Sequence, residues 1–325
     1  MLPTTRVVYL LAASHSGSTL LALLLNGHPE LCSVGELKVN SLGDVSRYRC
    51  SCGRLILTCP FWDGVTRDLH GAGVDFSIER PGTDFSALPS AAARRLLKPL
   101  HRGRVFEALR DAALSLSPAW RRHLPRTQEN NVALMRAVLV RSGKCAIVDS
   151  SKIGLRLKYL LRNPTLDAKV VRLVRDGRAV AQTYMDPAVF ADSTRPELRG
   201  GGTGGTRESE RLSMAEAARE WRRSQEEADT VLRGIDRSRW IQLRYEDLCR
   251  DTEGELRRVF SFLGVASDEK ITLRGSEHHV VGNGMRLDDS REVRLDERWR
   301  DSLSPTDLST FERVAGETNR RLGYQ

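Results

Sequence analysis

The stretch that decides the fold is residues 7–25, VVYLLAASHSGSTLLALLL. Its first six residues are apolar and include β-branched and aromatic side chains, a pattern that predicts a buried strand over 7–12. Small residues at 13–18 predict a loop, and the leucine-rich segment that opens at Thr19 predicts a helix. A buried strand, a loop and a helix in this order are typical of the start of an α/β fold.

Three more short apolar runs predict strands, at 145–148, 169–174 and 240–243. Each is followed by a segment with helical periodicity, at 154–162, 177–185 and 252–263. Strands that alternate with helices in this way predict a central parallel sheet flanked by helices.

Capping signals mark the starts of three helices. A capping box of Ser213 and Glu216 precedes one long helical segment, and a box of Thr252 and Glu255 precedes another. Ser304 followed by a proline predicts the start of the last helix.

A long insert, residues 38–143, separates the first helix from the second predicted strand. It is rich in Arg, Ala and Leu without clear strands, so we expect helices over the sheet and a candidate lid. Residues 198–208, LRGGGTGGTRE, contain too many glycines for a packed element and predict a mobile loop. No internal repeat divides the chain, so residues 1–325 are expected to form one domain.

The composition predicts a globular chain with an anionic partner. With 40% hydrophobic residues, 325 residues can bury a sizeable core, and the longest apolar runs fall well short of the ~20 residues of a membrane span. The 51 Lys+Arg exceed the 42 Asp+Glu, and only seven of them are lysines. Arginine suits phosphate and sulfate, whereas the aromatic residues are not interleaved with the basic ones as in nucleic-acid-binding modules. The N-terminus lacks the pattern of a signal peptide, so we expect a cytoplasmic protein.

Three of the six cysteines cluster in RCSCGRLILTCPFW, as Cys50, Cys52 and Cys59. A C-x-C pair with a third cysteine is compatible with zinc if a ligand comes from elsewhere, but structural zinc sites prefer C-x2-4-C in matched pairs. A disulfide or redox-sensitive pair is a second possibility. Reduced structural thiols are the interpretation that we favour from the sequence.

The loop after the first strand has the placement of an anion site. Its small residues let backbone N–H groups converge at a helix N-terminus, where the helix dipole favours a phosphate or sulfate. Against the G-x4-G-K-[ST] pattern, Gly17 and Thr19 fit, but Ala12 replaces the first glycine and Ser18 the lysine. A nucleoside triphosphate loop is therefore disfavoured, and an ordinary Ser/Gly turn remains the alternative.

A second segment, VVRLVRDGRAVAQTYM at 170–185, places Arg175 at the end of a strand and Thr183 two turns into the next helix. Ligands of open α/β sheets bind at the carboxyl ends of the strands, so Arg175 is expected to face the same crevice as the first loop. The alternative is a structural salt bridge of Asp176 with Arg175 or Arg178.

Together these segments resemble the sulfotransferases that use 3′-phosphoadenosine 5′-phosphosulfate (PAPS), whose α/β fold is related to the P-loop nucleotide kinases. SHSGSTLLALLLNGHPELCSVGEL resembles the family's 5′-phosphosulfate loop and acceptor-side segment, and VVRLVRDGRAVAQTYM its 3′-phosphate segment. IVDSSK, WIQLRYEDL with FSFLGV, and HHVVGNGMR follow in the expected order, so the resemblance spans residues 7–286. Among branches, it is closest to the tyrosylprotein and bacterial carbohydrate-type enzymes.

The resemblance implies a donor site in which the first loop holds the 5′-phosphosulfate, and Arg175, Thr183 and Arg286 the 3′-phosphate. Tyr245 is expected near the adenine or as support for a loop. The full implied set is Ser14, His15, Ser16, Gly17, Ser18, Thr19, Arg175, Thr183, Tyr245, Asn283 and Arg286.

Three residues are expected to act on the transferred group. His15 occupies a position that holds an arginine or lysine in relatives, and Lys152 in VDSSK matches a lysine that reaches the sulfuryl group. Glu36, in the G-E step of CSVGEL, matches the catalytic glutamate and is the expected base, although the spacing differs by one residue. His15, His278 and His279 remain rival bases.

The sequence therefore predicts a sulfotransferase that moves a sulfuryl group from PAPS to a hydroxyl acceptor and needs no metal. The acceptor is a small molecule, a carbohydrate or a natural product, and neither its identity nor the oligomeric state is visible in the sequence. The alternative is a phosphotransferase of the related nucleotide-kinase fold.

Overall fold

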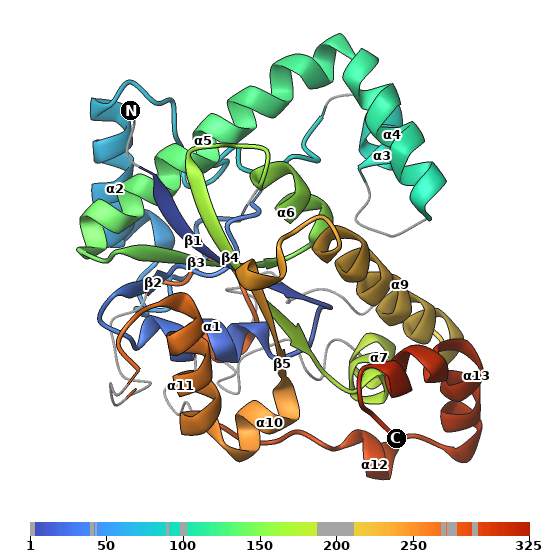
Figure 1. Cartoon of the computed structure of the whole chain (residues 1–325). Helices are drawn as coiled ribbons and strands as arrows, with labels where there is room; N and C mark the ends of the chain where they lie inside the picture. The colour runs from blue at the N-terminus through green and yellow to red at the C-terminus, as the bar shows by residue number, and fades with distance from the viewer. Residues whose placement is uncertain are drawn as a thin grey trace.

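The chain folds around a five-stranded sheet in which all strands are parallel (Figure 1). The computed structural model describes residues 4–39, 42, 44–88, 91–97, 103–186, 211–267, 271, 278–287 and 292–325. The strands are β1 (Thr5–Ala12), β2 (Leu31–Ser33), β3 (Ala146–Lys152), β4 (Leu166–Val174) and β5 (Trp240–Arg244), in the order β2-β3-β1-β4-β5. The predicted α/β fold with a central parallel sheet is confirmed.

Two strands differ from the sequence expectation. The edge strand β2 was missed, because three residues carry too short a periodicity to be recognised. Strand β3 was expected to end at residue 148 but continues to Lys152, through polar residues that are buried. Those residues satisfy one another, since the Ser151 amide donates to Asp149 Oδ1 at 3.0 Å.

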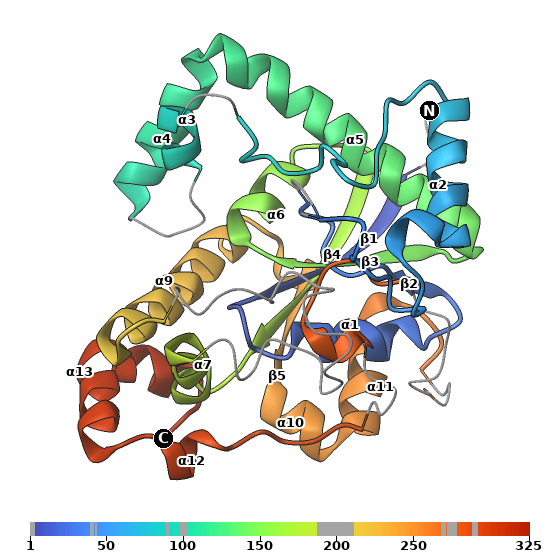
Figure 2. The ribbon, with the colours of Figure 1, turned by 180° about the vertical axis from the view of Figure 1, so that it is seen from behind.

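Helices cover both faces of the sheet. Alternate side chains of β1 are therefore buried on opposite faces, each against a different set of helices. Val8 and Leu10 pack in one apolar cluster with α1 (Ser18–Asn26), α10 (Tyr245–Arg250) and α11 (Thr252–Leu263). Val7 and Tyr9 pack on the opposite face in another cluster, with α5 (Pro118–Ser142), α6 (Gly154–Leu160) and α9 (Met214–Leu232). Figures 1 and 2 show α1 and α11 on one side of the sheet and α5 and α6 on the other.

A third apolar cluster joins α9 to α7 (Gly177–Met185), α12 (Trp299–Ser302) and α13 (Pro305–Arg321). The rings of Trp221 and Phe311 lie 5.8 Å apart at its centre. Gly177 is required there, because a Cβ atom would come within 2.6 Å of Phe311. This packing fixes the start of α7, the helix that follows β4.

Two of the three predicted helix caps are confirmed. Ser213 forms a capping box at α9, and Ser304 caps α13. The box at Thr252 was wrong, because Asp251 is the N-cap and its carboxylate accepts a hydrogen bond from the Gly254 amide at 2.9 Å. The Thr252 hydroxyl instead donates to the Leu248 carbonyl.

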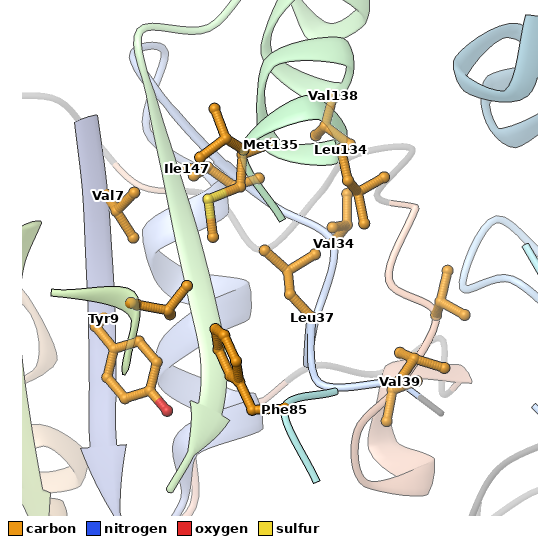
Figure 3. Packing of buried hydrophobic residues seen from close by; sticks show 14 of the residues in the cluster. Val7, Tyr9, Val34, Leu37, Val39, Phe85, Leu134, Met135, Val138 and Ile147 are labelled. Atoms are coloured by element: carbon orange, nitrogen blue, oxygen red, sulfur yellow. The ribbon is translucent and has the colours of Figure 1, made fainter. Parts of the chain in front are cut away.

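The insert at 38–143 is helical, as predicted. It contains η1 (Ile56–Thr58), α2 (Pro60–Gly71), α3 (Ala91–Leu96), α4 (Arg104–Leu116) and α5. Leu134, Met135 and Val138 of α5 point into the core toward Ile147 of β3 (Figure 3). Helix α5 is therefore a fixed layer of the fold and not a lid, while a lid role for α3 and α4 stays a prediction.

Two expectations concern other parts of the chain. The glycine-rich loop at 198–208 lies outside the described residues. Among the helices that the structure describes, none combines the length and apolar character needed to cross a bilayer.

Candidate functional site

A cavity of about 560 Å³ lies at the carboxyl edge of the sheet. Its walls include residues that directly follow β1, β4 and β5 and the last residues of β3. This is where open α/β sheets bind ligands, and the volume is that of a small-molecule site. The lining residues are Ser14, His15, Gly17, Ser18, Thr19, Leu20, Glu36, Lys38, Ser151, Lys152, Ile153, Arg175, Thr183, Tyr245, Val281, Gly282, Asn283, Met285, Glu292, Arg294, Asp296 and Arg298.

The loop between β1 and α1 forms one end of the cavity. Gly17 is the N-cap of α1, with a φ of 86°, and as a glycine it supplies no side-chain cap. The hydroxyl of Ser16 is buried and has no hydrogen-bond partner in the described part of the chain. An uncapped N-terminus offers its first N–H groups and the positive end of the helix dipole to an anion. This geometry suits a phosphate or sulfate group.

Tyr245, the first residue of α10, covers this loop. A Cβ atom at position 17 would lie 2.5 Å from the Tyr245 ring, so only glycine permits the contact. The Tyr245 hydroxyl donates to the Arg294 carbonyl at 3.1 Å and accepts from the Asp296 amide at 3.3 Å. Burial raises the pKa of this phenol, which keeps it neutral. Tyr245 therefore positions the loop and the segment opposite it.

Two residues of the cavity have strained backbones. His15 has a φ of 61° and Lys152 a φ of 71°, and they are the non-glycine residues with positive φ in the described ranges. Such a conformation costs about 1–3 kcal/mol and persists where the surroundings impose it, which is common at functional sites. The His15 ring also packs edge-on against the Tyr184 ring, with 5.2 Å between the ring centroids.

Arg175 follows β4 and reaches the loop from the opposite side. Its guanidinium donates to the His15 carbonyl at 3.0 Å and to the Asp296 carbonyl at 2.9 Å, and it lies 4.4 Å from the centre of the Tyr245 ring. An ion pair with the Asp296 carboxylate, at 3.1 Å, completes its contacts. Burial alone would raise the pKa of Asp296, but the hydrogen bond from Arg298 and the charge of Arg175 outweigh it and lower that pKa.

The sequence left a structural salt bridge as the alternative role for this segment. The structure divides the two arginines: Arg178 pairs with Asp176 at 2.7 Å, whereas Arg175 faces the cavity. Thr183 also lines the cavity, and its hydroxyl donates to the Ala179 carbonyl at 3.1 Å.

Glu36 and Lys152 form an ion pair inside the cavity. Their side chains are 20% and 15% exposed, so the pair is partly shielded from water. Glu36 follows β2, and its amide donates to the Val281 carbonyl at 3.0 Å. Lys152 is the last residue of β3. A carboxylate, which can accept a proton, and an ammonium group, which can stabilise negative charge, are thus held side by side.

A buried network supports the end of β3. Arg156 donates to Asp149 Oδ2 at 3.0 Å and to Asn131 Oδ1 at 2.6 Å, and both charged side chains are almost fully buried. Asp149 also binds the Ser151 amide, next to Lys152. This network has no signature in the sequence, because VDSSK contains the aspartate but gives no sign of its partner on α6.

The segment 278–287 lies beside the first turn of α1, and it holds the remaining predicted residues in different surroundings. The Asn283 amide donates to Thr19 Oγ1 at 3.2 Å. Arg286 does not line the cavity: its fully buried guanidinium donates to the carbonyls of Arg49 and His279. Of the three rival bases, His15 lines the cavity, but His278 and His279 do not.

Some cavity residues could not be found from the sequence. Lys38 and Ser151 lie beside recognised motifs and showed no chemistry of their own. Arg294, Asp296 and Arg298 belong to a charged stretch, REVRLDER, that resembles an ordinary solvated surface. A pattern of alternating charges was the available signal, and it does not distinguish a cavity wall from an exposed face.

Comparison with known proteins finds a similarity to sulfotransferases over part of the chain. A family model described as the sulfotransferase family matches residues 155–269. Carbohydrate sulfotransferase 1 of Mus musculus is 24% identical over 184 residues, which cover 52% of this chain and 42% of the relative. Carbohydrate sulfotransferase 3 of Homo sapiens is 26% identical over 178 residues. These residues cover 52% of this chain and 36% of the relative. The match thus spans less than half the length of these relatives.

Among solved structures, the sulfotransferase domain from the Synechococcus PCC 7002 olefin synthase is similar at 19% identity. Its TM-score is 0.47, with 99% of this chain and 96% of that chain covered. By the family model and the curated relatives, the chain is similar to the sulfotransferase family. The resemblance seen in the sequence is confirmed at this level.

Proposed function

We propose that the protein transfers a sulfuryl group from PAPS to a hydroxyl acceptor and releases adenosine 3′,5′-bisphosphate. The observation that carries this proposal is the shared cavity: an uncapped anion loop, a buried arginine and a Glu–Lys pair line one space of about 560 Å³. The loop suits the 5′-phosphosulfate, and Arg175 suits the 3′-phosphate.

The proposed reaction is a displacement at sulfur. The acceptor oxygen forms a bond to sulfur while the bond between sulfur and the bridging oxygen of the donor breaks, and the electron pair of that bond leaves with the bisphosphate. Glu36 takes the proton of the hydroxyl. Lys152 and the loop N–H groups stabilise the negative charge on the sulfuryl and leaving oxygens.

The ion pair of Glu36 and Lys152 makes donor binding precede proton transfer in the proposed reaction. In the protein as described, each charge is compensated by the other. An anionic sulfuryl group competes with Glu36 for Lys152, so donor binding frees the carboxylate to accept a proton. His15, which stands where relatives carry a stronger cation, adds a hydrogen bond at the same end of the cavity.

The acceptor is proposed at the level of its chemical class. The curated relatives are named carbohydrate sulfotransferases, which makes sugar hydroxyls the first acceptors to test. Small molecules and natural products with a free hydroxyl form the second group.

Transfer of labelled sulfate from PAPS to a panel of acceptors tests the proposal. The expected result is a labelled product with an equal amount of adenosine 3′,5′-bisphosphate, and loss of both in Glu36→Gln. Magnesium-dependent consumption of ATP, with no turnover of PAPS on any acceptor, would instead establish the phosphotransferase alternative.

A further inference from the structure

A cluster of three cysteines and one histidine lies apart from the cavity. Cys50, Cys52 and Cys59 come from the start of the insert, and His278 lies 219 residues further along the chain than Cys59. The four ligand atoms lie within 4.8 Å of one another, and none of the four residues lines the cavity. The sequence showed the three cysteines but gave no sign that a histidine joins them.

The distances within the cluster fit a tetrahedral zinc ion. With Zn–S bonds of about 2.3 Å and Zn–N bonds of about 2.0–2.1 Å, tetrahedral ligands lie about 3.8 Å apart for two sulfurs and about 3.5–3.6 Å apart for sulfur and nitrogen. The structure has 3.7 Å between the sulfurs of Cys52 and Cys59. His278 Nδ1 lies 3.6 Å from Cys50 Sγ and 3.5 Å from Cys59 Sγ.

The unusual C-x-C spacing has a structural explanation. Cys50 and Cys52 lie in a turn that is closed by a hydrogen bond from the Gly53 amide to the Cys50 carbonyl at 2.9 Å, and this turn brings both sulfurs to the cluster. The Ser51 amide donates to the His279 carbonyl at 3.1 Å, and Ser51 Oγ accepts from the His279 amide at 2.9 Å. This pairing holds the two cysteines beside His278.

The surroundings fix the other two ligands. Cys59 is the N-cap of α2 and is fully buried, as is Cys50. The His278 ring stacks on Phe61, with 4.3 Å between the centroids and 3° between the planes, and the His278 carbonyl accepts from Trp62 Nε1 at 3.1 Å. The ring is thus oriented by contacts that leave Nδ1 turned toward the sulfurs.

We propose that Cys50, Cys52, Cys59 and His278 bind one Zn²⁺ in a structural site. Three thiolates and one imidazole fill the four positions of tetrahedral zinc and leave none open for a substrate. The ion ties the insert to the segment that continues into Val281, Gly282 and Asn283 of the cavity wall. This inference is independent of the proposed sulfuryl transfer.

The metal content of the full chain tests the site. After purification without chelators, elemental analysis is expected to give about one zinc per chain. Cys52→Ala, chosen because Cys52 is only partly buried, is expected to reduce this to less than a tenth. Cys145→Ser is the matched control, since Cys145 is exposed and outside the cluster, and it keeps the metal.

Two further measurements keep the test decisive if Cys52→Ala does not fold. Replacing the metal of the wild-type chain with cobalt is expected to give the intense visible bands of tetrahedral Co²⁺ and the near-ultraviolet thiolate bands. His278→Cys offers a fourth thiolate and is expected to retain zinc, whereas His278→Phe loses it.

Three results would overturn the proposal. The first is a wild-type chain that carries no zinc and takes up none at equilibrium. The second is a Cys52→Ala variant with unchanged zinc content. The third is a mass 2 Da lower than the reduced chain that persists without reductant, since it would show a disulfide within the cluster.

Discussion

The two walls of the cavity are built in different ways. One wall consists of residues at the ends of parallel strands: the loop after β1, Lys152 of β3 and Arg175 after β4. The other consists of the segments 278–287 and 292–298, which lie outside the sheet and are held by individual contacts such as the ion pair of Asp296 with Arg175. The difference teaches that Lys152 and Arg175, to which we assign roles in the proposed reaction, stand at the ends of sheet strands, whereas the other wall is held in place by contacts to the sheet.

Glu36→Gln is expected to have the largest effect, because Glu36 connects the two walls: its carboxylate pairs with Lys152, and its amide binds the Val281 carbonyl. The substitution keeps the backbone contact and removes the basicity. Turnover should fall by about 10² to 10⁴, the usual contribution of a general base, while bisphosphate binding stays nearly unchanged. Steady-state kinetics and a binding titration on the same variant check this.

The matched control is Glu79→Gln, an exposed glutamate that does not line the cavity. If Glu36→Gln keeps normal turnover, the base is another group, and His15 is the next candidate because it lines the same cavity.

Lys152→Ala removes a cation from the strand-end wall. Because Lys152 is proposed to act mainly on charge that develops in the transition state, turnover should fall by about 10² or more, with a smaller change in donor affinity. Lys158→Ala is the control, since Lys158 pairs with Asp111 on α4 at 2.7 Å, away from the cavity. Equal losses in turnover and donor affinity would mean that Lys152 only holds the donor in place.

Substitution of Arg175 and of Arg286 should have different effects, one on ligand binding and the other on stability. Arg175 lines the cavity, so Arg175→Ala should weaken bisphosphate binding by about 10- to 100-fold, as for the loss of charge-assisted hydrogen bonds. Arg286 is buried against the carbonyls of Arg49 and His279, so Arg286→Ala should lower the denaturation midpoint first. Calorimetric titration and urea unfolding of both variants check the contrast. A strong loss of affinity in a fully stable Arg286→Ala would restore the 3′-phosphate role predicted from the sequence.

Glu227 supports the strand-end wall from behind, through the start of α6, and its substitution tests this support. Its carboxylate accepts from the Leu155 amide at 2.5 Å, just after β3, and burial raises its pKa to about 7. Since the folded pKa lies above the unfolded value, this group lowers stability as pH rises from about 4.5 through 7. Glu227→Gln keeps an acceptor oxygen and should be about 3 kcal/mol more stable than wild type at pH 8, with the difference falling to about 1 kcal/mol at pH 5.

Urea unfolding at pH 5, 6, 7 and 8 measures this difference. Glu226→Gln is the neighbouring control, because its carboxylate is partly exposed and pairs with Arg222. A difference between Glu227→Gln and wild type that does not change with pH would show that Glu227 does not titrate in this range.

The sequence predicted the strand-end wall well and the other wall poorly. A buried strand followed by small residues or by an arginine has a local pattern, and the fold brings the ends of parallel strands together, which is how Ser14 and Arg175 were predicted. Glu36 was predicted from the family resemblance alone, because the strand before it, β2, was not recognised. Asp296 and Arg298 had no such pattern, because their position depends on contacts between distant segments. Arg286 is the opposite case: its motif was recognised in the sequence, but its side chain is buried in the protein interior and does not line the cavity.

The proposed zinc site was also visible only in part in the sequence. The spacing of Cys50, Cys52 and Cys59 was visible, but the preference for reduced thiols followed from the absence of a second cysteine pair. His278 supplies the fourth ligand from a segment that is distant in the chain and adjacent in space. Long-range pairings of this kind leave no periodic trace in one sequence.

The most direct test of the account is a calorimetric titration of the wild-type protein with adenosine 3′,5′-bisphosphate in the absence of magnesium. We expect one molecule to bind per chain, with clearly higher affinity than adenosine 5′-monophosphate, because the loop and Arg175 recognise two separate phosphate groups. Binding of magnesium–ATP together with no heat from the bisphosphate would contradict the proposal that this cavity holds a PAPS-type donor.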